Sequence, residues 1–87
     1  MCGILGIVGK APVARDIIYG LTALQHRGQD AAGVVTFEGR FFMKKENGLV
    51  NQVFKSEVEA ERMLGNIGLG HVRYATQGTT DAFDAQP

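Results

Sequence analysis

The chain has 87 residues, which is the size of one small domain. Its nine basic and nine acidic residues cancel, so no net field favours a nucleic acid or an anionic membrane as partner. Its apolar runs fall far short of the ~20 residues that cross a membrane, and no secretion signal opens the chain. A single cysteine excludes an internal disulfide framework and favours a reducing, cytoplasmic compartment.

The N-terminal third predicts a strand followed by a helix. The apolar run Ile4 to Val8 is typical of a short buried strand, and Gly9 ends it. Pro12 suits the first turn of a helix, where its missing N–H costs nothing. Apolar residues then recur at helical spacing, at Val13, Ile17, Leu21 and Leu24. We expect this helix to end at Gly28 and to cover one face of a sheet.

The middle of the chain predicts a β-hairpin. Ala32 to Phe37 is rich in strand-forming residues, Glu38-Gly39 is a turn, and Phe41 to Lys45 continues in an extended run. Glu46-Asn47-Gly48 ends the second strand.

A surface helix and a last strand follow the hairpin. Ser56 and Glu59 have the spacing of a capping box, and Gly65 ends the helix that they begin. Its narrow apolar face consists of Val58, Met63 and Leu64. Ile67 to Tyr74 is the last strand, with the polar loop 77–80 beyond it. Strands that flank helices, with a hairpin between them, favour a layered α+β domain.

Cys2 is the first candidate for chemistry. Removal of Met1 would leave a thiol and a free α-amine on one residue. The amine titrates near pKa ~7.7–8.0 and the thiol near ~8.5, so the amine can take the thiol proton near neutral pH. Cys2 is therefore a candidate self-activated nucleophile. The structural alternative is a buried, inert cysteine.

Two other stretches concentrate polar side chains. The segment 24–30, Leu-Gln-His-Arg-Gly-Gln-Asp, lies at the predicted helix end, where His26 and Arg27 could simply cap the helix. Arg73 lies near the end of the last strand, where it could bind a carboxylate in bidentate fashion or form a surface ion pair.

The two histidines suggest two further kinds of chemistry, general base catalysis and metal binding. His26 or His71 could act as the base for Cys2, and the sequence cannot place either imidazole beside the thiol. One cysteine and two histidines far apart in the sequence do not make a metal site, so we predict none.

Three stretches together resemble the class II glutamine amidotransferases. They are Cys2-Gly3-Ile4, the ten residues 24–33, and His71-Val72-Arg73-Tyr74-Ala75-Thr76. The segments 47–50, 53–54 and 85–87 also match, so the resemblance covers the whole chain in order. Gln29 and Tyr74 favour members with a phosphoribosyltransferase domain over glucosamine-6-phosphate synthases, which usually carry tyrosine and tryptophan there. Residues 1–87 would be a partial amidotransferase domain.

The resemblance implies a fold and a set of roles. The fold is that of an N-terminal nucleophile hydrolase, a four-layer αββα sandwich, here only its N-terminal portion. Cys2 would be the nucleophile and its own α-amine the base. Arg73, with Thr76 beside it, would bind the α-carboxylate of glutamine. Arg27 and Gly28 would support the nucleophile.

The same resemblance implies partners and cofactors beyond this chain. Ammonia from glutamine would pass to a second domain that acts on phosphoribosyl pyrophosphate to give 5-phosphoribosylamine in purine biosynthesis. That domain would need Mg²⁺, some members hold a [4Fe-4S] cluster, and full-length members are commonly homotetramers. No cofactor is expected within these residues.

Several family features would lie beyond Pro87, including an Asn-Gly pair of the oxyanion hole and an aspartate that holds the substrate amine. We therefore expect the chain alone to have negligible glutaminase activity. A retained Met1 would also block the amine of Cys2. The alternatives are another class II enzyme, of the glucosamine-6-phosphate or glutamate synthase type, and a non-catalytic domain of the same fold.

Overall fold

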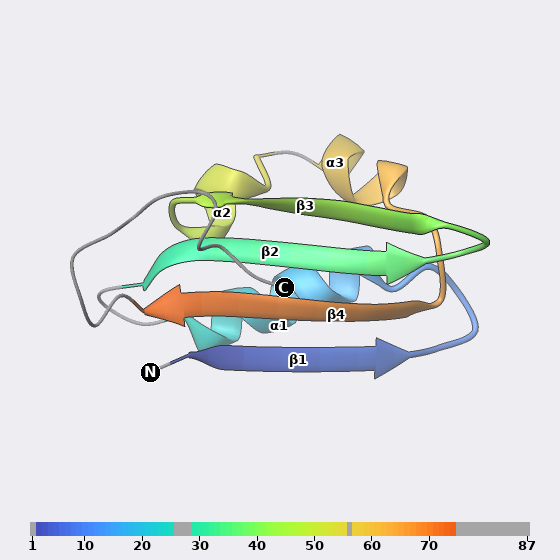
Figure 1. Ribbon diagram of the computed structural model, residues 1–87, viewed down its shortest axis with the longest axis horizontal. Coiled ribbons are helices and arrows are strands. Elements are labelled where there is room, and N and C mark those ends of the chain that lie inside the picture. The colour runs from blue at the N-terminus through green and yellow to red at the C-terminus, as the bar shows by residue number, and fades with distance from the viewer. Residues whose placement is uncertain (1, 26–28, 56, 75–87) are drawn as a thin grey trace.

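The computed structural model describes residues 2–25, 29–55 and 57–74, with Glu57 described by its backbone alone. These residues form one four-stranded antiparallel sheet with helices on one face (Figure 1). The strand order is β1-β4-β2-β3, so the first and last strands in the sequence are neighbours. In chain order the elements are β1 (Gly3–Val8), α1 (Ala14–Leu24), β2 (Gln29–Phe37), β3 (Phe41–Asn47), α2 (Val50–Val53), α3 (Glu57–Arg62) and β4 (Ile67–Tyr74).

Helix α1 forms the centre of the core, and Figure 1 shows it crossing the sheet on the far side. The predicted apolar stripe is confirmed: Val13, Ile17 and Leu21 are buried, and Leu24 packs half-buried against them. The helix begins after Pro12 and ends at Leu24, earlier than predicted. Gln25 is already extended, with ψ of 141°.

Glycines on β4 let α1 approach the sheet closely. A Cβ atom on Gly70 would lie 2.4 Å from Cγ2 of Ile17, and one on Gly68 would lie 2.6 Å from its Cδ1. Real Cβ atoms do not approach a carbon that closely, so any side chain at these positions would push the helix outward. The glycines of the last strand thus set the distance between helix and sheet.

The predicted hairpin is confirmed and is longer than expected. β2 begins at Gln29 and β3 continues to Asn47, with Phe37 paired to Phe41 at the turn. Gly39 has a positive φ of 71°, as the turn requires.

Two short helices connect β3 to β4. α2 was not predicted; its first turn is held by Gln52, whose Oε1 accepts a hydrogen bond of 2.8 Å from the N–H of Leu49. In α3 the predicted apolar face is wrong in part. Val58 and Leu64 are exposed and Ala60 is buried, while Met63, just beyond the helix, is buried as predicted. Ser56, the first residue of the predicted capping box, lies outside the described residues.

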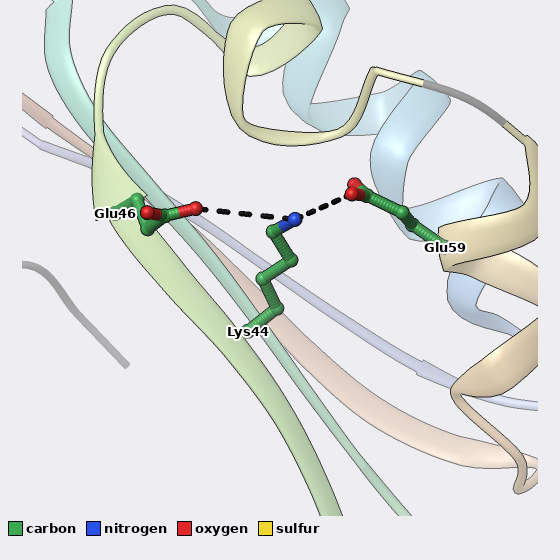
Figure 2. A network of polar contacts seen from close by, with 3 residues as sticks. All are labelled: Lys44, Glu46 and Glu59. Carbon is green, nitrogen blue, oxygen red and sulfur yellow. Dashed lines mark hydrogen bonds and ion pairs between the residues drawn. The ribbon is translucent and has the colours of Figure 1, made fainter.

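A charged pair attaches α3 to the sheet (Figure 2). The ammonium of Lys44 on β3 donates to Oε1 of Glu59 at 2.6 Å, and Oε2 of Glu46 lies 3.9 Å from the same nitrogen. The hydrogen bond from Lys44 lowers the pKa of Glu59 below its usual 4.5, against the opposing effect of partial burial. This polar contact helps to hold α3 against the sheet, as apolar packing holds α1 against it.

The other face of the sheet carries no described element. We call it the open face. Directly paired residues of an antiparallel sheet share a face, so the register identifies its members. Its exposed apolar side chains are Ile4, Val8, Phe37, Phe41, Met43, Ile67 and Leu69. One sheet and one helical layer are two of the four layers that the resemblance implies, and the α+β class is confirmed.

Candidate active site

Cys2 lies one residue before β1 and is exposed. The next residue, Gly3, pairs with Val72 of β4 and faces α1, since a Cβ atom there would lie 3.5 Å from Cβ of Leu24. Successive side chains of a strand point to opposite faces. Continuing that alternation by one residue places Cys2 on the open face.

Arg73 follows Val72 on β4 and therefore belongs to the open face as well. The β1–β4 pairing ends at Gly3–Val72, and if the same register continued by one step, Cys2 and Arg73 would face each other across the two strands. Residues that face each other in an antiparallel pair have Cβ atoms about 4.5–5.5 Å apart. The register therefore places the predicted nucleophile and the predicted carboxylate-binding residue at the same end of the sheet, each one step beyond the last pair of the β1–β4 ladder.

Polar side chains gather at this end of the open face. Continued across the sheet, the register gives two rows that run from β1 to β3. The first holds Cys2, Arg73, Ala31 and Asn47, and the second holds Ile4, His71, Gly33 and Lys45. The next two rows, toward the hairpin turn, consist of Gly6, Leu69, Val35 and Met43, then Val8, Ile67, Phe37 and Phe41. The open face is therefore polar at one end and apolar at the other.

His71 is the most buried side chain among the polar members of these rows, with 6% of its surface exposed. Burial lowers the pKa of its imidazole below 6.5, which favours the neutral form at neutral pH. Its Nδ1 atom is buried and has no hydrogen-bond partner within the described residues. No described hydrogen bond joins His71 to Cys2, to which it lies diagonally, so the role of base for His71 stays untested.

Gln25 and Gln29, two described residues of the segment 24–30, have a structural role that the sequence did not reveal. Nε2 of Gln29 donates to the carbonyl oxygens of Ala31 at 2.8 Å and Gly48 at 2.7 Å. The side chain of Gln25 accepts a hydrogen bond from the N–H of Val50 at 3.2 Å. The Gln29 amide thus connects the start of β2 to the loop between β3 and α2, and the Gln25 amide connects the end of α1 to the first residue of α2. In the sequence, only the run of hydrogen-bonding side chains in the segment 24–30 could have suggested these contacts.

Tyr74 anchors the end of β4 on the helical side. Its hydroxyl donates a hydrogen bond of 2.6 Å to the carbonyl of Leu24, the last residue of α1. This bond connects two segments that both belong to the resemblance, and it fixes the strand end that carries Arg73.

The remaining predicted site residues, Arg27, Gly28 and Thr76, lie outside the described residues, as does His26. The predicted capping of α1 by His26 and Arg27 is therefore not described, although the helix itself has ended at Leu24. Asp30, the last residue of the segment 24–30, has both carboxylate oxygens buried without a hydrogen-bond partner among the described residues. A buried carboxylate is costly unless it is paired.

Within ranges 2–25, 29–55 and 57–74, no group of three or more histidine, cysteine or acidic side chains is arranged to hold a metal ion. In the same ranges, α1 is the longest helix with 11 residues, and no helix has the length and apolar character needed to cross a membrane.

The sequence is similar over its whole length to curated amidophosphoribosyltransferases. It is 56% identical to that of Haemophilus influenzae and 52% identical to that of Escherichia coli, with 100% of this chain and 17% of each relative covered. The protein of Methanocaldococcus jannaschii is 48% identical, with 100% of this chain and 19% of the relative covered. The chain thus spans less than a fifth of the length of these relatives. No protein-family model matches it.

Two solved structures have the same fold. The structure described as the allosteric regulatory enzyme of purine biosynthesis superposes with a TM-score of 0.88 at 36% identity, over 100% of this chain and 18% of that one. Glutamine phosphoribosylpyrophosphate amidotransferase from B. subtilis, complexed with ADP and GMP, gives a TM-score of 0.75 at 38% identity, over 88% and 17%. The predicted N-terminal portion of an N-terminal nucleophile hydrolase is confirmed.

Proposed function

Because the chain is homologous over its whole length to the N-terminal region of the amidophosphoribosyltransferases, we propose that it forms part of the glutamine-hydrolysing domain of such an enzyme. The full-length protein would be a glutamine-dependent glycosyltransferase. Ammonia released from glutamine would displace pyrophosphate from phosphoribosyl pyrophosphate and give 5-phosphoribosylamine for purine biosynthesis. The observation that carries this proposal is the register of β1 against β4, which brings Cys2 and Arg73 to the same end of the sheet.

The chemistry begins with the removal of Met1, which frees the α-amine of Cys2. The amine takes the thiol proton, and the thiolate attacks the carbonyl carbon of the glutamine side-chain amide. Collapse of the tetrahedral intermediate forms a γ-glutamyl thioester, and the amine returns the proton to the leaving ammonia. Water then hydrolyses the thioester to glutamate and restores the thiol. Exposure of Cys2 gives the substrate access to the sulfur.

Substrate binding falls to Arg73. A guanidinium can bind the α-carboxylate of glutamine through two parallel charge-assisted hydrogen bonds. Its position across from Cys2 then directs the side-chain amide toward the thiol. We assign Thr76 to the same carboxylate, and Arg27 and Gly28 to the support of the nucleophile, on the resemblance alone.

The metal and cluster that the full-length enzyme would need are assigned to residues outside this chain. We assign the Mg²⁺ of the phosphoribosyltransferase step, and any [4Fe-4S] cluster, to the rest of the polypeptide. A homotetramer and a cytoplasmic location are likewise proposed. A reducing compartment suits a nucleophilic thiol.

Covalent labelling tests the proposal. A glutamine-analogue electrophile should modify Cys2 of the full-length protein in a 1:1 ratio, and glutamine should protect it. Cys2→Ser should abolish glutamine-dependent synthesis of phosphoribosylamine and leave ammonia-dependent synthesis intact. A protein that is not labelled, or that liberates ammonia at a normal rate with Met1 attached, would refute the proposed chemistry.

A further inference from the structure

His71 is a polar residue in a position where packing alone would favour an apolar one. It pairs with Ile4 on β1 and with Gly33 on β2, and the next open-face residue toward the hairpin turn is Leu69. A buried polar atom without a hydrogen-bond partner destabilises the fold, because it has lost its bonds to water and gained none. The buried and unpartnered Nδ1 atom of His71 therefore points to a contact made by a group outside the described residues.

The location of His71 connects it to the proposed site. Arg73 lies two residues further along β4 on the same face, which is about 7 Å away along a strand. Gly33 offers no side chain on the β2 side of His71, so its β2 neighbour supplies no side-chain partner for the imidazole. The neutral form can accept or donate one hydrogen bond at Nδ1 without adding a positive charge beside the guanidinium.

We propose that His71 is a positioning residue for Arg73, and that it acts through a hydrogen bond between its buried Nδ1 atom and a group outside the described residues. The proposal rests on the proposed function, since it assigns to His71 a part in glutamine binding. His71 does not contact the reacting atoms in this assignment. It fixes the end of β4, and so the distance between the guanidinium and the thiol.

Three substitutions of His71 distinguish the contribution of the Nδ1 atom from that of the Nε2 atom. In the full-length protein, His71→Asn keeps an amide close to the position of Nδ1, His71→Gln moves the amide toward that of Nε2, and His71→Leu removes both. We expect the Gln and Leu variants to raise the KM for glutamine about 10-fold or more, and the Asn variant to stay within about 3-fold of the unsubstituted protein. Ammonia-dependent synthesis should be unchanged in all three variants. The rate at which iodoacetamide, which needs no carboxylate-binding residue, alkylates Cys2 should also be unchanged.

The outcomes are distinct. A Leu variant with a normal KM for glutamine would overturn the assignment, as would an Asn variant as impaired as the Leu variant. A parallel loss of ammonia-dependent synthesis would mean that His71 only maintains the fold, and would also overturn it. These results count against His71 alone if the unsubstituted protein uses glutamine and is labelled at Cys2. Absence of that labelling would instead overturn the proposed function.

Discussion

At the scale of single residues, Arg73 allows the most direct test of substrate binding. Replacing it by alanine removes a charge-assisted pair of hydrogen bonds, each worth about 1.5–3 kcal/mol, so the KM for glutamine should rise about 100-fold or more in the full-length protein. Ammonia as nitrogen source bypasses this contact and should be used normally. Steady-state kinetics with both nitrogen sources provide the measurement. Equal losses with glutamine and ammonia would show that Arg73 does not bind the carboxylate.

Glu59 leads to a prediction about pH. Its pKa is lowered in the folded chain, chiefly by the hydrogen bond from Lys44, so the pair stabilises the fold fully above pH 4.5. That stability is lost as the pH falls through the lower pKa of the folded state. Urea unfolding between pH 7 and pH 3 should show a difference between wild type and Glu59→Gln of at most about 1 kcal/mol at pH 7, narrowing in acid. Parallel curves would show that the pair contributes no pH-dependent stability.

At the scale of secondary structure, the contact between α1 and β4 is set by glycine. Gly70→Ala would place a methyl group 2.4 Å from Ile17 and 3.0 Å from Leu21, and overpacking of this kind destabilises by about 1–3 kcal/mol. Gly6→Ala is a matched control on the open face, because its methyl group would lie 3.6 Å from Leu69, an ordinary contact. Urea unfolding midpoints of the two variants provide the comparison. Equal midpoints would show that α1 can shift without cost.

The elements that the sequence predicted well are those with a repeating apolar pattern. α1, β4 and the hairpin follow from local periodicity and turn residues. The end of α1 does not follow from local periodicity, because partners far along the chain fix it: Gln25 bonds to Val50, and Leu24 bonds to Tyr74. α2 was missed because four residues are too few to show a helical period.

At the scale of the whole molecule, the candidate site follows from a pairing that no local pattern reveals. The sequence identified Cys2 and Arg73 by residue type and by resemblance. Their proximity depends on the register of β1 against β4, which joins segments some 70 positions apart in the chain. The burial of His71 could not be predicted from the sequence either, because the face that it occupies and its exposure both depend on how the strands pair.

The apolar end of the open face predicts how the isolated chain behaves. Seven exposed apolar side chains lie on this face, and a hollow of about 280 Å³ there is lined by Val35, Thr36, Phe37, Phe41, Ile67, Gly68 and Leu69. A continuous apolar patch of this kind on a soluble chain promotes association. The 87-residue chain should therefore self-associate at micromolar concentration in analytical ultracentrifugation and should bind a hydrophobic dye.

Lysine substitutions on the two sides of the molecule distinguish association through the open face from non-specific association. Phe41→Lys and Ile67→Lys place charges at the apolar end of the open face, where the wild-type side chains are 74% and 48% exposed, and should shift the chain toward monomer. Tyr19→Lys is the matched control, because Tyr19 lies on α1 and is 62% exposed. It should leave the association unchanged. If Tyr19→Lys dissociated the chain as effectively as the other two, association would not run through the open face, and the case that this face needs a covering layer would fail.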